Sequence, residues 1–232
     1  MMCHCSGMRA TGVDACRRGW VAVTLEGGST AAAVRVDAEL AALLAPGPDG
    51  DDAGPVGIDM PLGLLESGWR EADRVARRLA GARRSSVFAI PPRAVWAEAS
   101  YALANQRCRE LTGQGFSVQA WGLRVKLLEA NRYRETCGHP LYEVHPELAF
   151  GALAGAPLPA SKHTPAGRDL RRRLLAEAGI QIPPLVPSAP LGDVLDAAAV
   201  AWSAARIAAG QAVTIPGQPQ RDPQGREITI RY

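Results

Sequence analysis

The chain has 232 residues, of which 47% are apolar, so it can bury the core of one large domain or two small ones. No segment is long and apolar enough to suggest a membrane span, and the first residues lack the pattern of a secretory signal. A net charge of only +3 excludes a protein that attracts nucleic acid through its overall charge. We therefore expect a cytoplasmic protein with no membrane contact.

The five cysteines do not form a paired framework. Cys3-His4-Cys5 is the one Cys/His cluster near the start, and it has no second pair at a zinc-finger distance. We therefore expect no zinc site. Residues 1–7 are predicted to be a disordered extension before the first strand.

Apolar runs bounded by turn residues predict the strands, and runs between a capping residue and a glycine predict the helices. In chain order, the sequence predicts strands at 9–14, 20–25 and 30–36, a short helix capped by Asp37 to residue 44, and a strand at 55–59. There follow a helix at 71–79, an extended segment at 85–92, and helices at 96–111 and, capped by Ser117, to about 137. The remainder is predicted as a strand at 141–145, helices at 146–153, 167–178 and 191–209, and a strand pair around 213–215 and 227–232.

This order predicts an α/β protein, in which three meandering strands are followed by helix, strand, helices, strand and helices. It fits a ribonuclease H-like mixed five-stranded sheet with flanking helices and a large helical insertion. We expect one domain over residues 1–232. Its core would comprise 8–60 and 139–232, and 61–138 would be the mostly helical insertion.

Several carboxylates are predicted to converge. Asp14 and Asp59 each end a run of small and apolar residues, where a buried strand meets the surface. Asp193 and Asp196 lie three residues apart, on one face of the last long helix. Glu143 lies in the strand at 141–145. Because converging carboxylates repel one another, a cation must offset the cost, and Mg²⁺ or Mn²⁺, as two ions, is the expected cofactor.

Each aspartate has an alternative structural role. Asp14 and Asp59 could form turns or cap helices. Asp193 lies in the first turn of its helix, where the helix dipole favours a negative charge. Asp196 lies one turn further in and is less easily explained in that way, so we rank it above Asp193.

The segment after Glu143 is equally open to two interpretations. Glu143 and His145 would share a face of the strand, because side chains alternate. Glu143 is a candidate ligand or base, whereas His145 is a ligand, a general acid or a core histidine. Glu147 falls in the first turn of the next helix, where it is a candidate site residue or a partner of the helix dipole.

A second group of residues is suited to binding phosphate, because guanidinium groups fork onto two oxygens and serine hydroxyls add donors. A solvated helix face is the alternative for any one of them, and Trp20, Trp96 and Trp121 are expected in the core rather than stacked on bases. The candidates are Arg83, Arg84, Ser85, Ser86, Arg93, Lys126, Lys162 and Arg168.

Seven segments in this order resemble the family labelled domain of unknown function 429, a predicted family of ribonuclease H-like nucleases. They are GVDACRRGW, IDMPLG, RRSSVFAIPPR, SVQAWGLRVKLLEA, YEVHPE, SKHTPAGR and DVLDAAAVAW, and they span nearly the whole chain. The resemblance implies that Asp14, Asp59 and either Asp193 or Asp196 are the carboxylates of the site. Gly192 stands where family members often carry a further aspartate.

The resemblance implies a nuclease that hydrolyses phosphodiester bonds in DNA or RNA, with Asp14, Asp59, Glu143 and Asp196 as catalytic residues and Asp14, Asp59, Asp193 and Asp196 as metal ligands. The alternative is a non-catalytic protein that binds nucleic acid or a phosphorylated ligand on the same fold. Nucleic acid is the expected partner in either case, and a homodimer is the default expectation because two-fold dimers are common.

Overall fold

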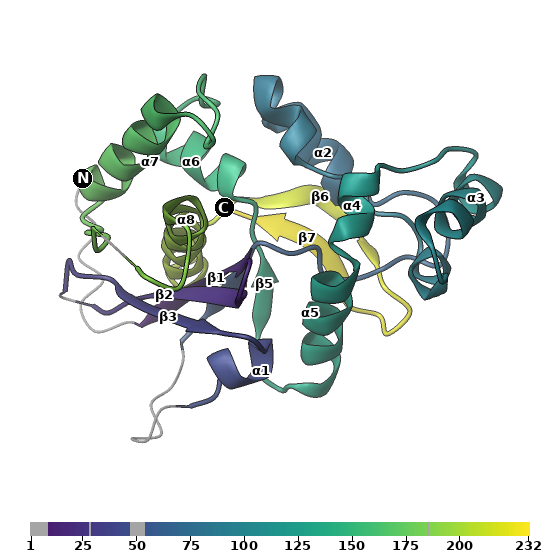
Figure 1. Cartoon of the computed structure of the whole chain (residues 1–232), viewed down its shortest axis with the longest axis horizontal. Coiled ribbons are helices and arrows are strands. Elements are labelled where there is room, and N and C mark those ends of the chain that lie inside the picture. The colour runs from purple at the N-terminus through teal and green to yellow at the C-terminus, as the bar shows by residue number, and fades with distance from the viewer. Residues whose placement is uncertain (1–8, 28, 47–53, 185) are drawn as a thin grey trace.

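A central five-stranded sheet with helices on both faces organises the chain (Figure 1). The computed structural model describes residues 9–27, 29–46, 54–184 and 186–232. The expected extension at 1–7 and its Cys3-His4-Cys5 cluster lie outside these residues.

The sheet is mixed, as the sequence predicts. Its order is β3-β2-β1-β4-β5, with β1 antiparallel to β2, β2 antiparallel to β3, and β4 parallel to both β1 and β5. The strands are β1 (Ala10–Cys16), β2 (Gly19–Leu25), β3 (Ala33–Asp37), β4 (Val56–Ile58) and β5 (Leu141–Glu143).

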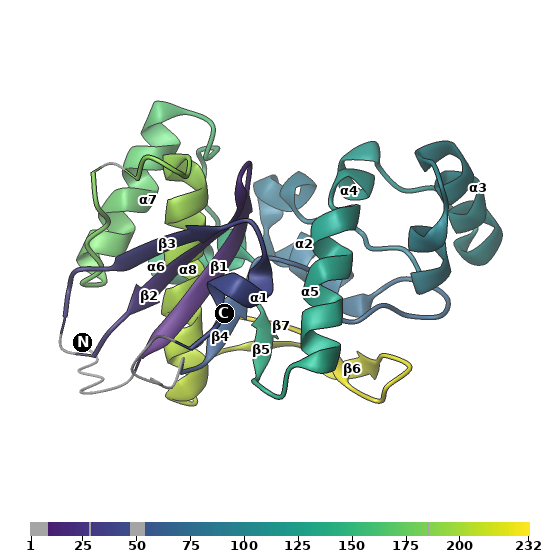
Figure 2. The same cartoon turned by 60° about the horizontal axis from the view of Figure 1, so that its bottom comes forward.

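Helices cover both faces of this sheet (Figures 1 and 2). On one face, α8 (Leu191–Ala208) lies along β1, with α6 (Pro146–Ala154) and α7 (Pro165–Glu177) packed against it. On the other face, α1 (Leu40–Leu43) packs against α5 (Arg124–Thr136) and the sheet.

The two faces can be told apart residue by residue, because side chains alternate along a strand. Val13 and Ile58 pack into the core on the α5 side. Gly12 and Gly57 turn to the other face, where a Cβ on Gly12 would lie 2.1 Å from the backbone nitrogen of Ala201 in α8. The backbone of α8 therefore rests directly on β1, and this contact requires glycine at position 12.

The segment between β4 and β5 is mostly helical, as predicted for the insertion at 61–138. Its outer helices lie to the right of the sheet in Figure 1. A two-stranded C-terminal sheet packs against α2 and β5. The further elements are α2 (Glu71–Leu79), 3-10 helices at Gly81–Ser86 and Arg93–Ala97, α3 (Tyr101–Thr112), α4 (Val118–Gly122), β6 (Thr214–Arg221) and β7 (Glu227–Arg231).

Several predicted boundaries are wrong. The helix expected at 96–111 is interrupted, because Glu98 is extended and Ser100 caps a new helix by accepting a hydrogen bond from the Leu103 amide. The helix expected from Ser117 to 137 is divided at Leu123, although Ser117 does cap its first part. The segment expected to be extended at 85–92 instead begins inside a 3-10 helix.

The short helix expected from Asp37 is also shorter than predicted. Its N-cap is Glu39, and the amide of Leu40 donates to the carboxylate of Glu129 in α5 at 2.7 Å. The side chain of Glu129, distant in the sequence, thus satisfies a backbone donor at the start of this helix, where we expected Asp37 to act as a local cap. In the described part of the chain, none of the helices combines the length and the apolar character needed to cross a membrane.

Candidate functional site

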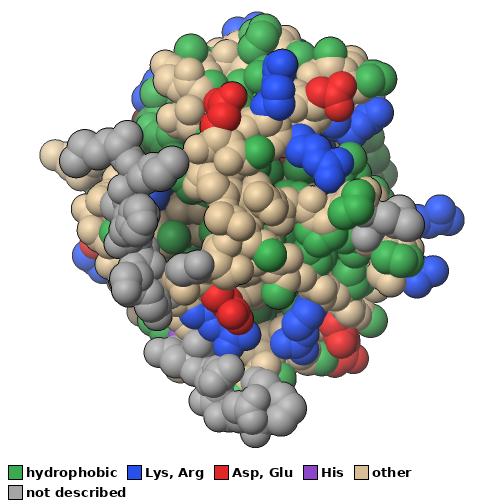
Figure 3. All heavy atoms as spheres, turned by 90° about the vertical axis from the view of Figure 1, so that its left-hand side faces the viewer, with side chains coloured by type: hydrophobic (Ala, Val, Ile, Leu, Met, Phe, Trp, Pro, Cys, Tyr) green, Lys and Arg blue, Asp and Glu red, His purple; other side chains and the backbone are tan. Residues whose placement is uncertain are grey.

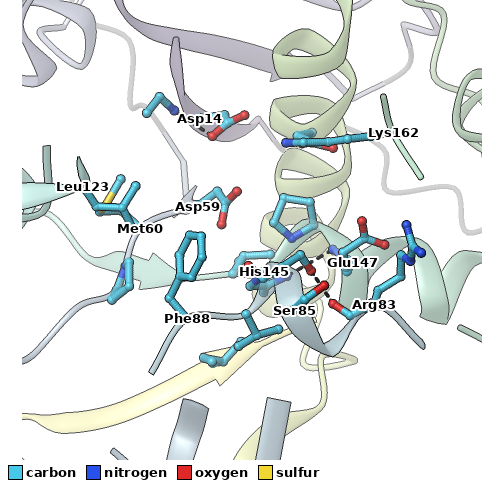
Figure 4. A pocket seen from close by; sticks show the side chains of 18 of the residues that line it. Asp14, Asp59, Met60, Arg83, Ser85, Phe88, Leu123, His145, Glu147 and Lys162 are labelled. Carbon is cyan, nitrogen blue, oxygen red and sulfur yellow. Dashed lines mark hydrogen bonds and ion pairs between the residues drawn. The ribbon is translucent and has the colours of Figure 1, made fainter. Parts of the chain in front are cut away.

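A cleft of about 780 Å³ lies where the carboxyl ends of β1 and β4 meet the first turns of α8 (Figure 4). Four of the predicted acidic residues line this cleft together: Asp14, Asp59, Asp193 and Asp196. The convergence expected of these four side chains is therefore observed.

The parallel pairing of β1 and β4 brings Asp14 and Asp59 together. Val13 pairs with Ile58, and the amide of Asp59 donates to the carbonyl oxygen of Val13 at 2.8 Å. Asp14 follows Gly12 by two residues and Asp59 follows Gly57 by two, so both carboxylates point to the α8 face. Asp14 is buried, and one of its oxygens accepts a hydrogen bond from the Ala15 amide at 2.7 Å.

The first two turns of α8 supply the other pair. Asp196 is only 2% exposed, whereas Asp193 is half-buried. Pro190 is the N-cap of this helix, so Asp193 is not the capping residue, although it does lie in the first turn. Because Gly12 allows α8 to lie against β1, Asp196 reaches the same cleft as Asp14.

Lys162 supplies positive charge to this cluster. Its Nζ lies 2.5 Å from a carboxylate oxygen of Asp196. Thr164 caps α7 by accepting from the Gly167 amide, and Pro165 follows at the first helical position, so the helix start holds the preceding loop in place. The sequence led us to expect that Lys162 binds phosphate, whereas in the structure Lys162 contacts Asp196.

The carboxylates perturb one another strongly. Burial, followed by the charges of Asp59 and Asp196, raises the pKa of Asp14 well above its usual value. Burial, followed by the charges of Asp196 and Glu147, raises the pKa of Asp59 to about 7, although Lys162 opposes the shift. Burial and Asp196 also raise the pKa of Asp193. The positive charge of Lys162 alone therefore does not balance the negative charge of the four aspartates.

His145 and Glu147 line the same cleft. His145 is the N-cap of α6, and its Nδ1 accepts a hydrogen bond from the Glu147 amide at 3.2 Å. Its proton is therefore on Nε2, which faces the Ser86 carbonyl oxygen at 3.4 Å, and burial lowers its pKa. The imidazole is neutral near pH 7 and can donate one hydrogen bond.

Glu147 combines a structural contact with a free oxygen. Its Oε1 accepts from the buried guanidinium of Arg171 at 2.7 Å. Its Oε2 is buried and has no hydrogen-bond partner among the described residues. An unpartnered carboxylate oxygen in the same cleft as Asp59 is available to a bound cation.

The structure gives Glu143 a different role from the one we assigned. It follows Leu141 by two residues and so lies on the α5 side of the sheet, opposite to Asp14 and Asp59. Both of its oxygens lie 2.6 Å from the buried guanidinium of Arg70, and one also accepts from the Leu62 amide. Glu143 borders the cleft, but Arg70 and the Leu62 amide already engage its two oxygens, so we remove it from the proposed ligands and bases.

The predicted phosphate-binding residues are divided between the cleft and other surfaces. Arg83, Ser85 and Ser86 line the cleft, as Lys162 does. Arg93 instead pairs with Glu135 at 2.9 Å, Lys126 with Glu129 at 3.2 Å, and Arg168 donates to the His163 carbonyl oxygen. Arg84, Arg93, Lys126 and Arg168 are not among the residues lining the cleft, so we omit them from the phosphate site.

Trp20 and Trp96 are buried in the core, as expected. Trp121 is half-buried and stacks on Trp96, with ring centroids 6.1 Å apart. None of the three lines the cleft.

One apolar wall of the cleft was not predicted from the sequence. Met60, Phe88 and Leu123 lie across the cleft from Lys162 and Arg83 in Figure 4. Gln119, on α4, lines the cleft as well. A weak signal existed, because Met60 and Phe88 stand inside the quoted segments IDMPLG and RRSSVFAIPPR. Apolar residues in such segments are more often core than wall, and only the folded chain distinguishes the two.

Among the described residues, no three carboxylate, imidazole or thiol side chains are already close enough together to hold one metal ion. The four aspartates nevertheless suit a hard cation, since burial and mutual repulsion raise the pKa of three of them and a cation would offset that repulsion. Asp14, Asp59, Asp193 and Asp196 are the residues that would hold such an ion.

The fold and cleft define an α/β protein with a cluster of acidic residues at the carboxyl edge of a mixed sheet. A family model described as protein of unknown function, DUF429, matches residues 12–221, so the chain belongs to that family. No curated protein and no solved structure matched the chain.

Proposed function

We propose that this chain is a divalent-metal-dependent nuclease that hydrolyses phosphodiester bonds in DNA or RNA. The carrying observation is the acidic cluster of Asp14, Asp59, Asp193 and Asp196, in which burial and mutual repulsion raise the pKa of three members. Mg²⁺ or Mn²⁺ is the expected cofactor, because such hard cations bind carboxylate oxygens.

The topology supports a ribonuclease H-like assignment for the sheet. An antiparallel meander of β1, β2 and β3 continues into β4 and β5, which are parallel to β1. The sequence led us to expect a mixed five-stranded sheet, and the observed pairing puts Asp14 and Asp59 at the ends of neighbouring parallel strands.

The chain's own residues would divide the remaining work. Asp14, Asp59, Asp193 and Asp196 would hold the ion, which supplies a nucleophilic water at neutral pH and charge stabilisation at the phosphate. Arg83 and Ser85 would bind phosphate oxygens from the rim, whereas the Ser86 hydroxyl already donates to the Arg83 carbonyl oxygen at 2.7 Å. Lys162 would add positive charge beside Asp196, and the neutral His145, whose Nε2–H faces the Ser86 carbonyl oxygen, would hold the segment of Ser86 at the cleft.

The position of the substrate follows from the distribution of charge. On the face shown in Figure 3, described side chains of both signs and apolar side chains are interspersed. The cleft instead holds Lys162 against Asp196 and Arg83 near Glu147 (Figure 4). We therefore place the scissile phosphate in the cleft.

The test is cleavage of labelled single-stranded, duplex, hybrid and branched nucleic acids with Mg²⁺, with Mn²⁺ and with a chelator. Asp14→Asn should lower the rate about a hundredfold or more, because a catalytic ion contributes several kcal/mol. The asparagine keeps the oxygen that accepts from the Ala15 amide, so folding should be preserved. Asp169→Asn, on the exposed side of α7, is the matched control and should cleave normally. Full activity of Asp14→Asn would refute the mechanism.

A specific observation favours one alternative, a non-catalytic protein that binds nucleic acid or a phosphorylated ligand. Lys162 already neutralises Asp196 at 2.5 Å, and no metal-binding group of three side chains is preformed among the described residues. Binding that persists in a chelator, with no cleavage of any substrate when metal is present, would establish this alternative instead.

A further inference from the structure

The cleft has two chemically different sides. One side carries the acidic cluster, Lys162 and Arg83, and the other, the apolar wall, carries the half-buried Phe88 and Leu123 with the almost fully buried Met60 (Figure 4). Phe88 is half-buried, packs against the core and lines the cleft. A ligand that joins a phosphate to an apolar ring could contact both sides of the cleft.

We propose that the apolar wall, through the half-buried Phe88 and Leu123, binds an unpaired nucleobase while Arg83 and Ser85 in the same cleft hold the adjoining phosphate. This inference rests on the proposed function and specifies its substrate as single-stranded nucleic acid or an unpaired end. The ring of Phe88 supplies the stacking surface, because every base has a π face that stacks on an aromatic side chain.

Gln119 adds the polar group that a base edge requires. It is exposed on α4, lines the cleft, and its amide has no hydrogen-bond partner within the described part of the chain. A carboxamide offers one acceptor and two donors, which can pair with the edge of a base. A lipid chain or an apolar peptide side chain would leave this amide unused.

The pairing state of the substrate follows from access to the base. In a duplex, the neighbouring bases cover both faces of each base, so a stacking wall can act only on a base outside the stack. The cleft volume of about 780 Å³ lies within the range of small-ligand pockets and suits a nucleotide rather than a helix. Duplex without an unpaired end should therefore bind more weakly than a single strand.

The experiment measures equilibrium binding in a chelator, so that it is independent of cleavage. The probes are a fluorescent thymidine hexanucleotide and a hexamer of abasic deoxyribose phosphates with the same charge. Phe88→Leu should weaken binding of the thymidine hexamer about tenfold and leave the abasic hexamer unchanged. Phe88→Tyr should bind the thymidine hexamer as tightly as the wild-type chain does, because it keeps the aromatic ring. Leu103→Ala, an exposed apolar residue of α3 outside the cleft, is the control and should change neither.

Two results would overturn the inference: equal effects of Phe88→Leu on both hexamers, or equal affinity for the thymidine hexamer and a blunt hairpin. If Phe88→Leu melts at a lower temperature than the wild-type chain, Gln119→Ala replaces it and should weaken only the thymidine hexamer. Thymidine monophosphate and inorganic phosphate are tested as competitors of the thymidine hexamer. Their competition distinguishes binding of a free nucleotide from binding of a nucleic acid strand. Base-dependent binding without cleavage would refute the proposed nuclease function and support base binding at the apolar wall. Cleavage at the same rate with and without Phe88 would support the nuclease function and refute base binding at this wall.

Discussion

Replacing Asp59 with asparagine should stabilise the protein at high pH. Burial and neighbouring carboxylates raise the pKa of Asp59 from its usual 3.8 to about 7. The folded state therefore binds this proton more tightly than the unfolded chain, and wild-type stability falls as the pH rises from about 4 to about 7. The asparagine of the Asp59→Asn variant carries no such charge, so the variant should escape this loss.

The magnitude follows from the shift. About three pKa units at about 1.4 kcal/mol each give an upper limit of about 4 kcal/mol. Asp59 is partly exposed and shares its repulsion with Asp14 and Asp196, so we expect a gain of about 1–3 kcal/mol at pH 8. At pH 4 the aspartate is protonated, and the two proteins should differ little.

Urea denaturation at pH 4, 6 and 8, in a chelator, measures the free energy of unfolding. Asp169→Asn is the control and should show no difference at any pH. Asp59→Asn that is less stable than wild type at pH 8, or a gain that is the same at all three pH values, would refute the argument. Adding Mn²⁺ at pH 8 should stabilise the wild-type chain more than Asp59→Asn, because a ligand that binds only the folded state adds stability.

Two further changes test the packing and the charge balance of the site. Gly12→Ala should cost about 3 kcal/mol or more in urea denaturation, because its Cβ would lie 2.1 Å from the Ala201 nitrogen, whereas Gly122→Ala, with nothing within 4 Å, should not destabilise. Similar effects of the two would contradict the close contact with α8. Lys162→Met should lower the free energy of unfolding by about 1–3 kcal/mol at pH 8 and by less at pH 5, where the raised carboxyl pKa values leave fewer charges for Lys162 to balance. A loss that is the same at both pH values would show that Lys162 acts through packing alone.

The order of strands and helices could be predicted because each strand is a short apolar run with turn residues at its ends. The interruptions in the insertion were missed for a local reason. Ser100 is a good N-cap, yet the apolar pattern continues across it, and the extended conformation of Glu98 depends on the surrounding chain. Leu40 shows the same limit, since its amide is satisfied by Glu129 from a distant helix.

The aspartates of the site were predictable, whereas their partners were not. A buried strand that ends in aspartate predicts the position of Asp14 and of Asp59, and helical spacing predicts that Asp193 and Asp196 share a face. The contact between Lys162 and Asp196 depends on where α7 begins in space, which no spacing along the sequence reveals. The apolar wall was missed because a residue such as Phe88 has the same sequence pattern whether it faces the core or a cleft.

The role of Glu143 shows which physical rule decides the composition of the site. Strand parity places residues 141 and 143 on one face, and Leu141 lies in the core on the α5 side. Glu143 must therefore face that side as well, where Arg70 neutralises it at 2.6 Å. Gly12 and Gly57 have the opposite parity, and the absence of their side chains lets α8 lie against the sheet. The carboxylates that meet in the cleft are therefore Asp14 and Asp59, each of which follows one of these glycines by two residues, together with Asp193 and Asp196 from α8.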